Sequence, residues 1–558
     1  MKLLCKQQTS LLRPHLLALT VIFLLTLMAY WELPQSFFQQ DEWHTFGYYN
    51  YLLSLGKEEF IANVLRSGLL THFTPLSLFF KMSLYQFFAL NSSLYFVVSI
   101  ILHIMVSITI YFFILMLVKK RLAAFLGSLF FALNSSHHQA ITWIGTFEGT
   151  QLATLFGLLS LITILFYFKK GKKKFFYISL SLILIALLFK ETAVTFLIVL
   201  FGLILFKEKK GLKKSSVFNL GLVVAFYIFL RFAYLLFKVG GLSTSASQNT
   251  EDFGLILGYN IFTIPVKIFT QIFFPNDLLV YITNITSSPF GIYQYFAKGP
   301  WVIESGFRYD LLTLSLGLLI IALMWWINQK IKNRQPFYLG LVLILLIVVP
   351  FLLLKKYLLY FDSRYLYPAT LGLSLIIGAT VAYLKIRLQR LVAALMLGIF
   401  LIVLVGHLVS LKVLINQQKE LGSERDRLLG YIKEQYPNLP QRVIFYTESD
   451  STYSGIPKIL PFQSGVGQML LIWYHPTENF PGDFFQNDFL WDIDSEGYRE
   501  FSGRGFGYYR DFPALKKAIT DYNMSINSVF AFSWNGTSGN LQDITVNVRD
   551  KLKSELNM

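Results

Sequence analysis

Residues 93–118, SLYFVVSIILHIMVSITIYFFILMLV, contain no Asp, Glu, Lys or Arg and are followed at once by Lys119-Lys120-Arg121. A helix needs about 20 consecutive apolar residues to cross a bilayer, so this stretch predicts a transmembrane helix. Ten further apolar runs, some of them short, predict transmembrane helices by the same criterion. The predicted spans are 15–31, 93–118, 122–135, 149–168, 174–189, 192–206, 216–237, 309–327, 337–354, 366–384 and 391–413.

The composition supports an integral membrane protein that has the lipid bilayer as a partner. Of the 558 residues, 54% are hydrophobic and 15% are charged, whereas about 25% are charged in an average soluble chain. This excludes a cytosolic enzyme, a secreted disulfide scaffold and a disordered chain. The single cysteine, Cys5, allows neither an intrachain disulfide nor a cysteine cluster for zinc.

Basic residues set the predicted orientation. Lysine and arginine favour cytoplasmic loops, and basic clusters fall at every second connection of the predicted spans. These clusters are 119–121, 169–174, 207–214, 330–334 and 385–390. We therefore expect a multi-pass protein of the plasma (inner) membrane with a cytoplasmic N-terminus. The net charge of +17 comes from this membrane part, so we expect no nucleic-acid partner.

The predicted fold is mostly α, with about 11 transmembrane helices over residues 1–413 and a small extracytoplasmic α/β domain over 414–558. Two other stretches, 75–90 and 253–274, are also apolar. If only one of them crossed the membrane, all later basic loops would lie on the outer side. We therefore expect interfacial or re-entrant helices at both places. Residues 174–206 are too long for one span and predict a hairpin. In the C-terminal domain we expect a helix at 423–434 and strands at 442–447 and 528–534.

Polar residues gather at the predicted outer ends of the spans, where ionisable groups are costly and therefore candidates for function. Asp41-Glu42-Trp43-His44 could supply a general base that deprotonates a hydroxyl, although an acidic pair alone also fits a solvated loop. His72 precedes the interfacial helix and could equally be a neutral loop residue.

A second polar group contains His137, His138, Trp143 and Glu148. Two histidines and a glutamate could ligate a divalent metal, but their spacing is not diagnostic, and contact with phosphate or sugar is the better use. We therefore assign no metal ligand and no certain cofactor.

The third and fourth groups are cationic. Lys190 with Glu191, and Arg364 with Tyr365, could hold an anionic headgroup, the arginine in a bidentate way. Singly, each cation also fits a side chain that reaches from the apolar region to the interface. All four groups lie on one predicted face, which suggests chemistry on a lipid-attached anionic donor.

Four short motifs resemble the GT-C superfamily of polyprenyl-phosphate-sugar glycosyltransferases. Asp41-Glu42 resembles the Asp-Glu motif of the protein O-mannosyltransferases. Residues 72–76 (HFTPL) and 91–94 (NSSL) are similar to the first outer loop of those enzymes and of the aminoarabinose transferases. Residues 188–193 (LFKETA) and 364–368 (RYLYP) resemble later motifs of the superfamily. The resemblance covers roughly residues 1–413.

The resemblance implies transfer of a sugar from a polyprenyl-phosphate donor to an acceptor outside the cytoplasm, usually with inversion. Asp41 would be the general base, and His44 would orient Asp41. Glu42 is the second candidate for the base. Arg364 and Lys190 would neutralise the leaving phosphate, and Glu191 would position Lys190. The acceptor, whether protein, glycan or lipid, does not follow from the resemblance. The C-terminal domain could bind the acceptor or stabilise the outer face.

Two other function classes remain open. A transporter or flippase of a lipid-linked precursor would place charges near the bilayer midplane and show pseudo-symmetric halves, and neither is visible. An O-antigen-type ligase or polymerase would need large, arginine-rich outer loops, whereas Arg308 is the single arginine of residues 238–308.

Overall fold

The structure is a computed structural model that describes residues 2–70, 73–208, 210–237, 253–285, 305–331, 333–352, 358–383, 389–453, 456–477 and 480–556. Its helices up to the C-terminal domain are α1 (Lys2–Ala29), α2 (Asp41–Ser54), α3 (Lys57–Leu70), α4 (Pro75–Phe88), α5 (Ser92–Val118), α6 (Arg121–Ala132), α7 (Gln139–Thr142), α8 (Phe147–Lys170), α9 (Lys173–Phe189), α10 (Val194–Lys207), α11 (Lys210–Phe237), α12 (Phe253–Phe273), α13 (Asn276–Ile285), α15 (Gly306–Lys330), α16 (Gln335–Leu352), α17 (Leu366–Tyr383) and α18 (Gln389–Gln435).

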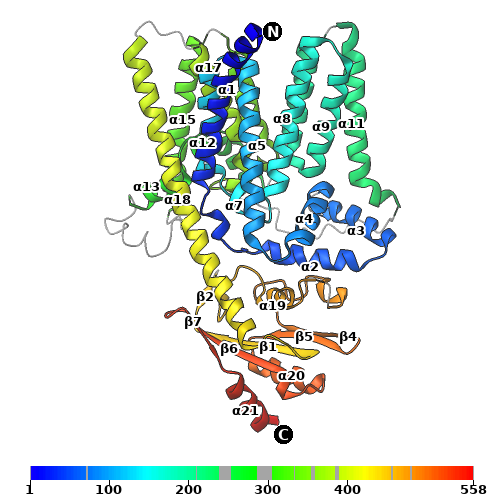
Figure 1. The fold of residues 1–558 in the computed structure, drawn as a ribbon. Helices are drawn as coiled ribbons and strands as arrows, with labels where there is room; N and C mark the ends of the chain where they lie inside the picture. The colour runs from blue at the N-terminus through cyan, green and yellow to red at the C-terminus, as the bar shows by residue number, and fades with distance from the viewer. Residues whose placement is uncertain are drawn as a thin grey trace. The chain divides into compact units, whose positions relative to one another are not determined.

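The described part of the chain holds nine helices that are long and apolar enough to cross a membrane, near α1, α5, α8, α11, α12, α15, α16, α17 and α18. Helices are the natural spanning structure because their backbone groups are satisfied within the segment. Each of the eleven predicted spans coincides with a helix, although three of these helices, α6, α9 and α10, are shorter than a full span. The mostly α, polytopic fold is thus confirmed. Figure 1 shows α8, α9 and α11 side by side.

Two compact units make up the chain. The first contains residues 1–31, 65–78 and 96–415, and therefore most of the apolar helices. The second contains residues 32–64, 79–95 and 416–558, so it joins the chain around α2 to the C-terminal residues. Each unit is described by itself below.

Close helix packing in the first unit depends on small residues. A Cβ added at Gly340 of α16 would lie 2.5 Å from the carbonyl oxygen of Gly372 in α17, and one added at Gly372 would lie 2.5 Å from that of Gly340. Because two backbones meet here, no side chain can move aside to make room. Such approaches through small residues are typical of packed membrane helices.

We expect Gly372→Ala to destabilise the protein by about 1–3 kcal/mol, the usual cost of overpacking. Thermal unfolding of the purified protein in detergent would show a lower midpoint. Gly202→Ala in α10 is the matched control, because nothing lies within 4 Å of a Cβ added there. Equal unfolding midpoints for the two variants would contradict this packing.

Helix α12 packs mainly against α15 and also holds the segment that precedes α17. Asn260 Oδ1 accepts a hydrogen bond from the Leu358 N–H (3.4 Å), and Gln271 Oε1 accepts one from the Phe361 N–H (3.2 Å). Along a helix these two side chains are about 16 Å apart at 1.5 Å per residue, yet their partners belong to one short segment before α17. The expected interfacial or re-entrant helix at 253–274 is not what the composition of α12 indicates, because α12 is one of the nine helices that are long and apolar enough to cross a membrane.

The predicted hairpin at 174–206 is interrupted at the expected place. Helix α9 ends at Phe189, Lys190 is extended, and a 3-10 turn at Glu191–Ala193 leads into α10. Lys190 and Glu191 are therefore at the break between two apolar helices.

The second unit contains the small α/β domain. Its strands are β1 (Arg442–Ser449), β2 (Thr452–Tyr453), β3 (Ile456–Pro457), β4 (Gly497–Phe501), β5 (Arg504–Tyr509), β6 (Val529–Asn535) and β7 (Asn540–Asp543), and its helices after α18 are α19 (Val466–Tyr474), α20 (Phe512–Asp521) and α21 (Thr545–Leu556). The main sheet has the order β4-β5-β1-β6-β7, with β1 parallel to β5 and β6. Both predicted strands, now β1 and β6, are confirmed. The predicted helix at 423–434 is the last part of α18.

Candidate functional site

Three of the polar groups predicted from sequence meet at one end of the helices of the first unit. The Arg364 guanidinium carbon lies 4.6 Å from the centre of the Trp143 ring and 5.0 Å from that of Tyr365. The Lys190 ammonium lies 5.7 Å from the same Tyr365 ring. Residues far apart in the chain thus form one cluster of two cations and two aromatic rings, which we call the cationic cluster (Trp143, Lys190, Arg364 and Tyr365).

Local backbone features place each cation at a helix end. Lys190 caps α9 in an extended conformation, and its ammonium donates to the Thr150 hydroxyl (2.5 Å) near the start of α8. Arg364 lies in the 3-10 turn Ser363–Tyr365 that precedes α17. The Gln139 N–H donates to the Ser363 hydroxyl (3.2 Å), which ties this turn to α7. The cluster therefore lies where apolar helices end.

Two donors of the cationic cluster are buried without a hydrogen-bond partner among the described residues. They are Nε of Arg364 and Nε1 of Trp143. Arg364 contacts Asp362 only through its terminal nitrogen, at 3.4 Å, and its side chain is 22% exposed. A buried donor without a partner lowers the stability of the fold by about 1–3 kcal/mol. A hydrogen bond from these N–H groups to an oxygen of an anionic ligand would therefore be favourable.

Glu191 has an ion-pair partner, Arg231, that was not among the predicted site residues. Its carboxylate forms an ion pair with Arg231 of α11 and accepts a hydrogen bond from the Phe73 N–H (3.1 Å). The signal was visible in the sequence, because Arg231 is a charged residue within the apolar run 216–237. The expected role of Glu191 in positioning Lys190 stays a prediction.

Glu148 and the two histidines lie close to the same end of the bundle. Glu148 is buried and accepts a hydrogen bond from the Ser77 hydroxyl (2.6 Å). His138 Nδ1 lies 3.3 Å from the Thr142 hydroxyl, and burial lowers the pKa of His138 to about 4. Burial lowers the pKa of His137 well below its ordinary value, with the neighbouring histidines adding to the effect. Both imidazoles are therefore neutral near pH 7.

His137 belongs to a buried aromatic cluster that includes residues not predicted from sequence. Its ring lies 4.8 Å from both the Phe131 and Tyr367 rings and 5.7 Å from the His103 ring. His103 in turn is hydrogen-bonded to the Tyr367 hydroxyl (2.9 Å). Within the described ranges no group of three His, Cys, Asp or Glu side chains could hold a metal ion. Contact of His137 with phosphate or sugar stays a prediction.

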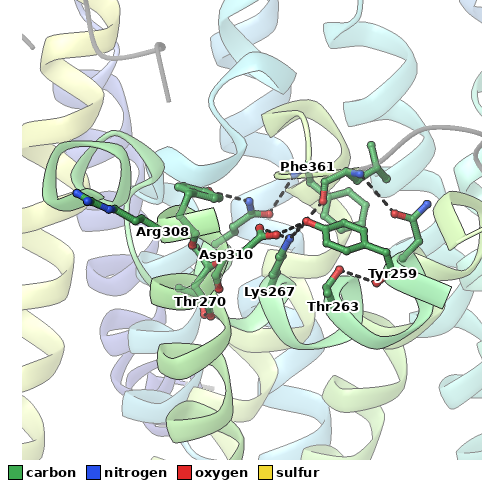
Figure 2. Close-up of polar contacts among 12 residues, drawn as sticks. Tyr259, Thr263, Lys267, Thr270, Arg308, Asp310 and Phe361 are labelled. Carbon is green, nitrogen blue, oxygen red and sulfur yellow. Dashed lines mark hydrogen bonds and ion pairs between the residues drawn. The ribbon is translucent and has the colours of Figure 1, made fainter. Parts of the chain in front are cut away.

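A further polar network in the first unit centres on Lys267 and Asp310, whose ammonium and carboxylate are 2.5 Å apart. Figure 2 shows both groups beside the Tyr259 hydroxyl, which bonds to each of them. Lys267 was not among the predicted site residues, although a lysine inside the apolar stretch 253–274 is itself a signal of function.

The acidic motif Asp41-Glu42 belongs to the second unit and begins α2. Glu42 is buried, and one of its oxygens accepts a hydrogen bond from the Gln40 N–H (2.8 Å). Asp41 is half-buried, and one of its oxygens lies 3.3 Å from the Gln40 amide nitrogen. The first two acidic residues of α2 are thus held in place at a helix N-terminus, where negative charge is favoured.

His44 connects this motif with the C-terminal domain. Its Nε2 lies 3.4 Å from Asp488, and its ring centre lies 4.6 Å from that of Trp491. Burial lowers the pKa of His44, while Asp488 and Asp41 oppose the shift. The chain before α2 is also tied to this domain, because the Ser464 hydroxyl donates to the Gln40 carbonyl (3.2 Å). His72, the remaining predicted site residue, lies outside the described residues.

Comparisons with known proteins find likenesses among solved structures alone. No protein-family model matches the chain, and no curated protein sequence matches it. Among solved structures, the chain is similar to the crystal structure of ArnT from Cupriavidus metallidurans bound to undecaprenyl phosphate. The identity is 11%, the TM-score is 0.45, and the match covers 93% of each chain. A likeness this distant assigns the chain to no family.

Proposed function

We propose that the protein is a membrane glycosyltransferase that moves a sugar from a polyprenyl-phosphate donor to an acceptor on the extracytoplasmic face. The observation that carries the proposal is the cationic cluster, in which Arg364 and Lys190 come together at the ends of apolar helices. The resemblance of the sequence motifs to the GT-C superfamily supports the same assignment.

The chemistry of the cluster fits a lipid-linked phosphate. The positive charges of Arg364 and Lys190 suit phosphate oxygens, and so do the buried Arg364 Nε and Trp143 Nε1 donors, which have no hydrogen-bond partner among the described residues. The surrounding helices are apolar enough for a polyprenyl chain to lie in the membrane beside them. The ring faces of Trp143 and Tyr365 could stack on a sugar, which has apolar C–H faces.

The proposed reaction is an in-line displacement at the anomeric carbon. The acceptor hydroxyl oxygen forms the new bond to this carbon, and the bond between the carbon and the phosphate oxygen breaks. The bonding electrons leave with the polyprenyl phosphate, where Arg364 and Lys190 stabilise the charge. We assign Asp41 as the base that takes the hydroxyl proton, with Glu42 as the second candidate. Displacement from the opposite side inverts the configuration.

Purified protein incubated with a radiolabelled polyprenyl-phosphate hexose and a membrane extract as acceptor source should release polyprenyl phosphate and label an acceptor. Heat-denatured protein is the control. A transporter or flippase would instead move the intact donor across a vesicle membrane and leave its phosphate–sugar bond unbroken. A ligase or polymerase would act on pyrophosphate-linked glycans and leave this monophosphate donor unchanged. Either result would overturn the proposal.

A further inference from the structure

Lys267 of α12 is a fully buried lysine that the proposed reaction does not use. Its side chain is 2% exposed, and its ammonium lies 2.5 Å from an Asp310 oxygen. It also donates to the Tyr259 hydroxyl (2.7 Å). Replacing such a buried pair by apolar residues is often neutral or stabilising, so stability alone gives little reason for a lysine at this place.

The lysine also contacts the backbone of the segment that leads to Arg364. Its ammonium lies 3.4 Å from the Leu358 carbonyl oxygen. On the same helix, Asn260 and Gln271 accept hydrogen bonds from the N–H groups of Leu358 and Phe361. Three polar side chains of α12 thus satisfy backbone groups of an irregular segment, which would be costly to leave unpaired in an apolar surrounding.

The segment 358–361, which α12 holds, leads directly to the cationic cluster. Phe361 is followed by Asp362 and then by the 3-10 turn that carries Arg364. Phe361, Lys267 and Tyr259 can be followed in Figure 2 as one set of contacts between α12, the start of α15 and the segment before α17. The segment that α12 holds is therefore continuous with the turn that carries Arg364, which α7 contacts as well.

We propose that Lys267, held by Asp310, is a positioning residue that fixes the 358–361 segment and so places the Arg364 guanidinium to bind a phosphate. The proposal deepens the proposed function and rests on it for the identity of the ligand. Lys267 itself need not touch the phosphate, because its ammonium is already surrounded by Asp310, Tyr259 and the Leu358 carbonyl.

The test uses the full-length protein in nanodiscs and the double variant Lys267→Met/Asp310→Leu, which leaves no buried unpaired charge. We expect its thermal midpoint to stay near that of the unmodified protein, while its affinity for a fluorescent polyprenyl phosphate falls about 5–10-fold. Hydrogen exchange of residues 358–365 should become faster without ligand. Lys330→Met is the matched control, because Lys330 is an exposed lysine at the last position of α15.

A comparison with Arg364→Gln separates positioning from a general loss of stability. If Lys267 acts through Arg364, the combined variant should bind the phosphate about as weakly as Arg364→Gln alone, whereas independent effects would multiply. The positioning role would be overturned if the two losses of phosphate affinity multiplied in the combined variant, or if hydrogen exchange of residues 358–365 did not change in Lys267→Met/Asp310→Leu. Unchanged affinity in both Arg364→Gln and Lys190→Met would overturn the proposed function, and the exchange result would still decide whether Lys267 fixes the 358–361 segment.

Discussion

Replacing Asp41 with asparagine should reduce sugar transfer by about 10²–10⁴-fold, which is the usual contribution of a positioned general base. Asparagine keeps the shape of the side chain and can still lie near the Gln40 amide, but it cannot accept the proton of the acceptor hydroxyl. Binding of the polyprenyl phosphate should stay unchanged, because the base contributes to the chemical step. Initial rates of transfer at saturating donor, together with an equilibrium binding measurement, would separate the two effects.

The neighbouring acidic residue provides the sharpest comparison. Glu42 is buried and its oxygen already accepts the Gln40 N–H, whereas Asp41 is half-buried. We therefore expect Glu42→Gln to reduce the rate less than Asp41→Asn. Asp521→Asn, on an exposed position of α20, is the control for the loss of a carboxylate. Normal transfer by Asp41→Asn would remove Asp41 from this role, and a larger effect at Glu42 would exchange the assignments.

Arg364→Gln should weaken the binding of polyprenyl phosphate by about 10–100-fold. A hydrogen bond to a charged group contributes about 1.5–3 kcal/mol, and each 1.4 kcal/mol corresponds to a tenfold change in affinity. Arg364→Lys should recover only part of the loss, because an ammonium keeps the charge without the planar set of N–H donors. Fluorescence titration of the full-length protein in nanodiscs would give the dissociation constants.

Two controls make the phosphate assignment specific. Arg334→Gln removes an exposed arginine that lies just before α16 and should leave the affinity unchanged. An uncharged polyprenol of the same length should bind the unmodified protein and Arg364→Gln equally. If Arg364→Gln and Lys190→Met both bind the phosphate normally, the cationic cluster is not the donor site.

The predicted site residues are divided between the two compact units. Trp143, Lys190, Arg364 and Tyr365 come together within one unit, as sequence order alone could not show. Burial lowers the pKa values of His137 and His138, so these imidazoles add no positive charge near pH 7, and their contact with phosphate or sugar stays a prediction. Asp41 and His44 belong to the second unit, where His44 meets Asp488 and Trp491 of the C-terminal domain.

The positions of the helices could be predicted from the apolar runs alone, because a backbone in lipid must satisfy its polar groups within each run. This is why every predicted span coincides with a helix and why Lys190 was expected at a break between two of them. Three contacts could be seen only in the folded chain: Arg231 pairs with Glu191, Lys267 is buried against Asp310, and α12 holds the segment before Arg364. Those contacts join residues about 40 to 90 positions apart, and they depend on which helix faces meet. The hydrophobic periodicity of a single helix does not show which other helix its apolar face will contact.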